Sequence, residues 1–173
     1  MSGLADTAGE AFNQLILDEL AVERSLKDSL AQRGITVVTT SGTLVTLVFA
    51  FTTLTTSSKA SPFQALAPWI RGLFVAGLAG FIVAVALGIA ISLPRKYNEV
   101  DEGGFATMLD PRYWSAADPV EGARAAATAR TEIIATFRRD NATNARLLRY
   151  AILAEFAAVS LLAGAAAGIV LPG

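Results

Sequence analysis

The sequence predicts an all-α integral membrane protein: a helical bundle with three transmembrane helices, two of which extend into the cytoplasm as stalk helices. Two features of the composition point to this class. The chain has 173 residues, of which 53% are hydrophobic and only 17% charged, whereas a soluble domain carries about 25% charged residues. The distribution is a third feature, because the charged residues avoid three long segments almost completely.

The three apolar segments are long enough to cross a bilayer. They cover residues 35–57, 72–93 and 150–171. Each has about 22 residues, roughly 33 Å as a helix, which matches a hydrocarbon core of about 30 Å. Pro94 and Pro172 directly follow the second and third segments, where a helix ends without losing internal hydrogen bonds. The segments are therefore predicted to be three membrane spans.

Two further helices are predicted outside the spans. Residues 10–33 gather their apolar side chains on one rough face, formed by Phe12, Leu15, Ile16, Leu20, Leu26 and Leu30. Residues 120–149 carry apolar residues near heptad spacing, and the turn-rich residues 97–119 precede them. No proline separates either helix from the span that follows it, so both approach the membrane in the same direction. We expect them to pair as a parallel stalk.

The predicted organisation has four regions. These are a cytoplasmic N-terminal helix, the first two spans with a short outer loop, a cytoplasmic connector with its helix, and the third span, over residues 1–34, 35–93, 94–149 and 150–173. Of the 14 Lys and Arg residues, only Lys59 and Arg71 lie between the first two spans. The positive-inside rule therefore places the N-terminus in the cytoplasm and the C-terminus outside the plasma membrane.

Several function classes have no support in the sequence. The chain has no Cys and no His, which excludes disulfides, thiol nucleophiles, the usual zinc sites and histidine acid–base chemistry. A formal net charge of −1 leaves no basic excess for binding phosphates. No nucleophile–base pair, P-loop or dinucleotide fingerprint is present. We expect no enzymatic activity, no cofactor, no metal and no nucleic-acid partner.

A stripe of small and hydroxylated residues runs through the first span. Its members alternate at steps of three and four, which places them on one helix face: Thr36, Thr39, Thr43, Thr46, Ala50, Thr53 and Ser57. Three interpretations stand. The hydroxyls bond back to carbonyls one turn earlier, hold the span against neighbouring helices, or line a water-filled path in an oligomer. Further threonines off the stripe, such as Thr40, favour the first two.

The second span carries a ladder of small residues spaced four positions apart. Its members are Gly72, Ala76, Gly80, Ala84 and Gly88. Such ladders let helix backbones approach closely where lipid surrounds them, so we expect close packing along this span. The third span has a shorter version in Ser160, Gly164 and Gly168.

Glu155 is the only acidic residue inside a predicted span. An ionisable group there costs at least ~2.5 kcal/mol unless it is paired, protonated or near the interface. We expect it to anchor the span through an arginine one or two turns earlier or through the hydroxyl stripe, with an ion or proton pathway as the alternative. Asn141 and Asn144 lie on the seam leading to it, where polar residues fix register and oligomeric state.

Four sequence features carry a resemblance to known proteins: the helix end Ser29-Leu30-Ala31-Gln32-Arg33-Gly34, the two close spans, Pro94-Arg95-Lys96, and the Asn141/Asn144 helix leading into another span. This layout resembles the small membrane effectors of bacterial cyclic-nucleotide defence systems of the Pycsar kind, and it covers most of the chain. The start of the first span, QRG…TTSGTLVTL, is similar to a group of uncharacterised actinobacterial membrane proteins. The effector resemblance implies oligomerisation and membrane disruption on a signal.

Three functional hypotheses follow from these patterns. The first is a non-enzymatic membrane protein that oligomerises through small-residue helix packing and offers a cytoplasmic stalk to a partner. The second is a pore-forming effector or channel lined by the hydroxyl stripe. The third is an accessory subunit of a transport or envelope complex. All three have the lipid bilayer as a partner, together with further copies of the chain or other membrane subunits.

Overall fold

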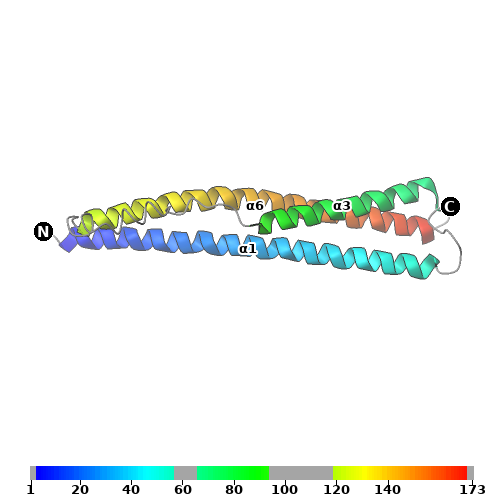
Figure 1. The fold of residues 1–173 in the computed structure, drawn as a ribbon, viewed down its shortest axis with the longest axis horizontal. Coiled ribbons are helices and arrows are strands. Elements are labelled where there is room, and N and C mark those ends of the chain that lie inside the picture. The colour runs from blue at the N-terminus through cyan, green and yellow to red at the C-terminus, as the bar shows by residue number, and fades with distance from the viewer. Residues whose placement is uncertain (1–2, 57–65, 94–118, 171–173) are drawn as a thin grey trace. The chain divides into compact units, whose positions relative to one another are not determined.

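The computed structural model describes residues 3–56, 66–93 and 119–170, and these residues form three α-helices (Figure 1). Their bounds are Gly3–Thr56 for α1, Pro68–Ser92 for α3 and Pro119–Val170 for α6. Helices α1 and α6 are each uninterrupted, so each predicted stalk helix and its span form one helix. Gly34 interrupts nothing.

All three helices are long and apolar enough to cross a membrane. This finding indicates a multi-pass membrane protein whose helices contact the bilayer. Helix α3 begins at Pro68, one turn before the predicted second span. Proline is favourable in a first turn because its missing N–H would have no helical partner there, and the Ala67 carbonyl accepts the amides of Ile70 and Arg71.

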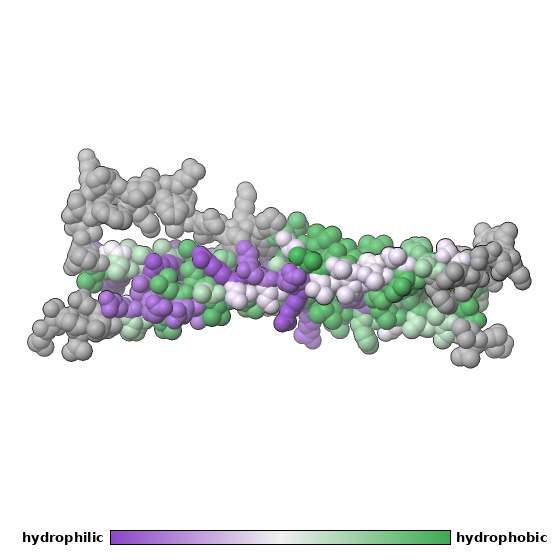
Figure 2. Space-filling view, turned by 90° about the horizontal axis from the view of Figure 1, so that it is seen from below, coloured by the Kyte–Doolittle hydropathy of each residue, from purple (hydrophilic) through white to green (hydrophobic). Residues whose placement is uncertain are grey.

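The chain divides into two compact units. We call residues 1–29 with 94–143 the polar unit, and residues 30–93 with 144–173 the apolar unit. Figure 2 shows hydrophilic side chains gathered over one part of the molecule and hydrophobic side chains over the other. The unit boundaries fall within α1 and α6, a few residues before the predicted starts of the first and third spans.

In the apolar unit the buried residues of each helix recur at alternating steps of four and three. Helix α3 buries Ile70, Phe74, Gly77, Phe81, Ala84, Gly88 and Ile91. Helix α1 follows the same rule with the buried set Leu30, Gly34, Val37 and Ser41. Helix α6 follows it with Leu148, Ala151, Ala158, Leu162 and Ala165, where the partly buried Glu155 occupies the position between Ala151 and Ala158. A mean step of 3.5 residues is the period of left-handed coiled-coil packing.

Helix directions in the apolar unit follow from contacts between the helices. Thr40 and Ser41 of α1 bond to Glu155 of α6. A Cβ on Gly77 would meet Leu162, whereas one on Gly168 would meet Trp69, so advancing along α3 means moving back along α6. Helix α3 is therefore antiparallel to α6, as Figure 1 shows.

The polar unit contains a second, smaller apolar core. Leu20 of α1 and Ile134 and Phe137 of α6 are buried there, with Ile16 and Ile133 packed against them. Four polar pairs join the same two helices: Asn13 with Arg130, Glu19 with Arg138, Glu23 with Arg138, and Glu23 with Asn141. Because the partners lie 115 to 119 positions apart, the two helices run parallel in this unit, in agreement with the parallel pairing expected from the sequence.

Candidate functional site

The hydroxyl stripe faces outward from the single chain. All of its described members are exposed: Thr36, Thr39, Thr43, Thr46, Ala50 and Thr53. The hydroxyls of the first four threonines donate to the carbonyl four residues earlier, at 2.9 to 3.0 Å, and that of Thr53 donates to the Ala50 carbonyl. The buried seam of α1 passes through Gly34, Val37 and Ser41, which places the stripe roughly 150° around the helix from that seam.

The described hydroxyls bond back to carbonyls of α1, as the first interpretation of the stripe expects. The other two interpretations require contacts with another molecule. Packing on another copy and lining a lumen both stay predictions, since the stripe does not belong to the buried seam of the chain. Ser57 lies outside the described residues.

The small-residue ladder of α3 packs closely over its second half. A Cβ on Gly80 would lie 3.0 Å from the Cβ of Ala158, and one on Gly88 would lie 2.9 Å from the Gly34 oxygen. Ala84 is fully buried between them. Gly72 has no neighbouring atom within 4 Å of the same position, and Ala76 is exposed. The first half of the ladder is therefore a small, open surface.

Glu155 pairs with hydroxyls that the stripe does not contain. Its Oε1 accepts hydrogen bonds from Thr40 at 2.6 Å and from Ser41 at 3.1 Å. Ser41 is fully buried and occupies a seam position of α1. Ser41 is thus on the inward face of α1, whereas Thr40 is exposed and lies between this face and the stripe. The arginines preceding Glu155 in α6 make no contact with it among the described residues.

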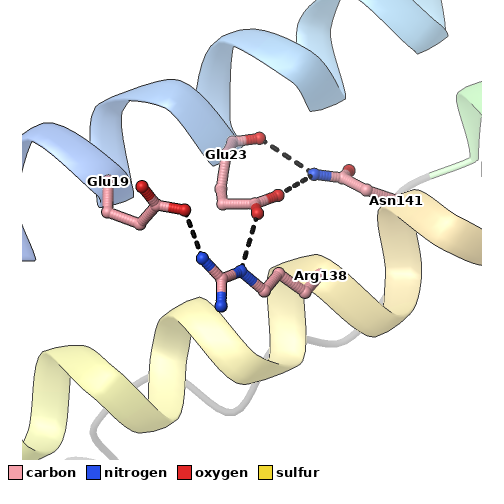
Figure 3. A network of polar contacts seen from close by, with 4 residues as sticks. All are labelled: Glu19, Glu23, Arg138 and Asn141. Carbon is pink, nitrogen blue, oxygen red and sulfur yellow. Dashed lines mark hydrogen bonds and ion pairs between the residues drawn. The ribbon is translucent and has the colours of Figure 1, made fainter.

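Among the described residues of the polar unit, Glu23 is the one buried carboxylate, and it lies at the centre of a four-residue network (Figure 3). Arg138 Nε donates to Glu23 Oε1 at 3.0 Å, and a second guanidinium nitrogen donates to Glu19. The bonds to Glu19 and then to Glu23 raise the pKa of Arg138 above its ordinary value. Asn141 Nδ2 completes the network with bonds to Glu23 Oε2 at 2.8 Å and to the Glu23 carbonyl at 3.0 Å.

Both seam asparagines are buried, and each has an unpartnered oxygen. Asn141 is 3% exposed and Asn144 6% exposed, and the Oδ1 atom of each has no hydrogen-bond partner among the described residues. The Asn141 amide faces Glu23 because both nearby Glu23 oxygens are acceptors. A buried acceptor without a partner costs about 1–3 kcal/mol, so each of these two oxygens lowers the stability of the folded chain. The benefit expected from the asparagines is specificity in helix pairing. Their role in fixing register stays a prediction.

A row of large apolar side chains lies exposed on α1 within the polar unit. Phe12 is 66%, Leu15 63%, Val22 60% and Leu26 45% exposed. Their positions are 3, 7 and 4 residues apart, and each lies one position before the buried seam, which displaces the row around the helix by roughly 100°. The position of this row between Leu15 and Val22 is Glu19, which pairs with Arg138 of α6. We call these four residues the second face of α1. Sequence reasoning placed some of them on the same face as the buried Leu20 and missed that α1 has two faces.

Other contacts that the sequence analysis missed also follow the 3.5-residue seam. Gly34, Ser41 and Glu23 all lie on it, and extending the heptad from Leu20 and Leu30 through the first span would have identified them. Arg138 is exposed and lies beside the seam, so only the structure connects it with Glu23.

No known protein family, no curated protein and no solved structure matches this chain. The class to which it belongs, a multi-pass helical membrane protein, rests on the three helices themselves.

Proposed function

We propose that this chain is a non-enzymatic protein of the cell membrane that works as a self-associated assembly, in which a second copy packs on the second face of α1. One observation carries this proposal: four large apolar side chains stand exposed along one side of α1 in the polar unit. An exposed row of this kind marks a surface that another molecule covers.

The spacing of the second face favours another helix as its cover. Helix α6 packs on α1 through residues at steps of three and four, and the second face keeps the same periodicity with Glu19 at its one position that is not apolar. A helix with two such faces has the pattern of a member of a larger bundle, yet α6 occupies only one of them.

We take a second copy of the chain to be the helix that covers the second face, because all copies insert into the same membrane. Copies inserted with the same topology are parallel, so the same face of α1 is presented at the same depth in each. In the apolar unit the outward side of α1 is built of short threonines whose hydroxyls bond to their own helix. Such a surface allows close approach between helices in lipid without leaving polar groups unsatisfied.

We further propose that the N-terminus lies in the cytoplasm and the C-terminus outside, and that the polar unit is where a cytoplasmic partner binds. Twelve of the 14 Lys and Arg residues lie outside the outer loop. Arg24 and Arg138, from the two basic segments, belong to one compact unit, which supports placing both segments on the same side of the membrane.

Cysteine cross-linking tests self-association, because the native chain contains no cysteine. Val22→Cys places a thiol on the second face, and Ala21→Cys places one at an exposed neighbouring position on a different side of the helix. On mild oxidation in native membranes we expect Val22→Cys to form disulfide-linked dimers at least about tenfold faster, since a residue beside the two-fold axis of a symmetric contact lies near its own copy.

Two results together would overturn the proposal. One is equal cross-linking of the Val22→Cys and Ala21→Cys variants, and the other is a monomeric mass for the unmodified chain in nanodiscs. Faster cross-linking of the Ala21→Cys variant would move the contact to another face of α1 and also contradict it.

A pore or membrane-disrupting assembly is the second candidate. The outward position of the hydroxyl stripe favours it, since an inward stripe could not reach a lumen formed between copies. The layout shared with the defence effectors is consistent with such an activity. Dye release from liposomes in at least one tested state is the result this candidate requires.

A further inference from the structure

The apolar unit contains one acidic side chain among its described residues, and that side chain touches only hydroxyl groups. Glu155 contacts Thr40 at 2.6 Å and Ser41 at 3.1 Å. Along the chain, the nearest basic residues are Arg33 on α1 and Arg149 on α6, seven positions before Thr40 and six before Glu155. Helix α3 has no charged residue between Gly72 and Ser92.

Taking Arg33 and Arg149 to lie at the edge of the hydrocarbon core, we place the carboxyl group of Glu155 inside it. Six or seven helical residues advance roughly 9–10 Å along the axis, about a third of a core of about 30 Å. A bare carboxylate at such a depth is costly. Two hydroxyl donors reduce that cost because they stabilise negative charge, but they carry no positive charge themselves.

The charge balance therefore requires one positive charge at Glu155. None of the described basic side chains contacts it. A divalent ion would leave an excess positive charge in the same apolar surroundings, because the site has a single carboxylate. A proton or an alkali ion neutralises the carboxylate and leaves no excess charge at the site.

The atoms around Glu155 suit such a hard monovalent cation. Thr40 Oγ1 lies 3.0 Å from the Thr36 carbonyl oxygen and 3.1 Å from the Val37 carbonyl oxygen. Together with Ser41 Oγ and the carboxylate these are all oxygen atoms, with no nitrogen or sulfur ligand among them. Ser41 is fully buried, so its hydroxyl is held in this position by the packing of α1.

We propose that Glu155, Thr40 and Ser41 form a binding site for one monovalent cation, a proton or an alkali ion, within the membrane and at the contact between α1 and α6. The site joins one residue of α6 to two residues of α1. Occupancy therefore stabilises the pairing of the two helices, and a bare carboxylate weakens it.

An apolar carbodiimide distinguishes the possible occupants, because dicyclohexylcarbodiimide enters lipid and reacts with protonated carboxyl groups. The full-length protein is reconstituted in phosphatidylcholine vesicles at neutral pH in choline, sodium or potassium chloride, and labelling of Glu155 is followed by mass spectrometry. Equal labelling in all three salts assigns the site to a proton. Labelling in choline that falls about tenfold when an alkali ion is present at ten times its dissociation constant assigns it to that ion.

Two variants sharpen the assignment. The Thr40→Val, Ser41→Ala double variant removes both hydroxyls and keeps Glu155, so protection by an alkali ion weakens at least about tenfold, whereas labelling of a proton-bound site persists. The control variant Thr39→Val removes a hydroxyl that bonds only to its own helix and leaves both readouts unchanged. Glu132, an exposed carboxyl on the same helix, serves as the internal reference for unspecific labelling.

Infrared spectroscopy detects a neutral carboxyl group directly by its carbonyl stretch. The Glu155→Gln substitution eliminates this band and thereby assigns it to Glu155. If wild-type protein in choline chloride shows neither the label nor this band, the carboxylate is bare and the proposal is wrong. Labelling of Glu155 no faster than that of Glu132 likewise overturns it.

Discussion

The backbones of Gly34 on α1 and Gly88 on α3 approach so closely that neither residue has room for a side chain. A Cβ on Gly34 would lie 3.0 Å from the Gly88 oxygen, and a Cβ on Gly88 would lie 2.9 Å from the Gly34 oxygen. The hydrophobic effect does not drive helices together in lipid, so close contacts of this kind provide the van der Waals energy that does.

The Gly88→Ala substitution should therefore destabilise the protein by about 1–3 kcal/mol, the usual cost of overpacking. Reversible unfolding in mixed micelles measures the change. Gly72→Ala is the matched control, because nothing lies within 4 Å of its Cβ position. That control should be neutral or stabilising by up to about 1 kcal/mol through helix propensity. Equal losses in the two variants would contradict the close contact.

The buried and the more exposed partner of Arg138 should differ in their contributions to stability. Glu23→Ala removes a buried carboxylate that accepts bonds from both Arg138 and Asn141, and losing hydrogen bonds to a charged group costs about 1.5–3 kcal/mol. Glu19→Ala removes only the more exposed ion pair, for which about 0–1 kcal/mol is usual. Thermal unfolding of the two variants compares them, and a larger loss for Glu19→Ala would show that the network is wrongly understood.

Replacing Thr39, Thr43 and Thr46 together by Val separates self-association from pore formation. These residues are exposed and bond only to their own helix, so we expect the triple variant to unfold within about 1 kcal/mol of the wild type. Dye release from liposomes is the second measurement. A leak present in the wild type and abolished in the variant would favour the pore.

Trp69 offers an optical report on the end of the bundle opposite Gly34. A Cβ on Gly168 would lie 2.3 Å from Trp69 Cη2, whereas one on Gly164 would meet only Leu73, at 3.7 Å. In a Trp114→Phe background, Gly168→Ala should shift the tryptophan emission because the indole must move, while Gly164→Ala should leave it unchanged. A shift in both variants, or in neither, would argue against this contact.

The sequence predicted the helices well because hydropathy and helical periodicity are local properties of the chain. The three spans, the helices preceding two of them and their parallel direction in the polar unit all follow from such patterns. The sequence was less informative about which side of each helix packs against its neighbours. Small residues repeat both in the stripe and on the seam, so within the first span residue type alone does not say that Ser41 faces inward while Thr39 and Thr43 face outward. That distinction requires the heptad to be extended from Leu20 and Leu30.

Partner choice depends on contacts between residues far apart in the chain. The sequence suggested that Glu155 pairs with an arginine of its own helix or with the stripe. Its partners are instead Thr40 and Ser41, which come from another helix and lie off the stripe. Only the relative register of α1 and α6 determines that choice, and register is a property of the folded chain.

The bonds from Thr40 and Ser41 to Glu155 span 115 and 114 positions of the sequence, and this separation imposes an order on biosynthesis. While the ribosome is still translating residues beyond α3, both residues of the Gly34–Gly88 contact have been made, but α6 does not yet exist. During that interval Glu155 is not available to Ser41, nor Arg138 to Glu23. Of the three described helices, α6 is thus made after the other two and completes the polar contacts of α1.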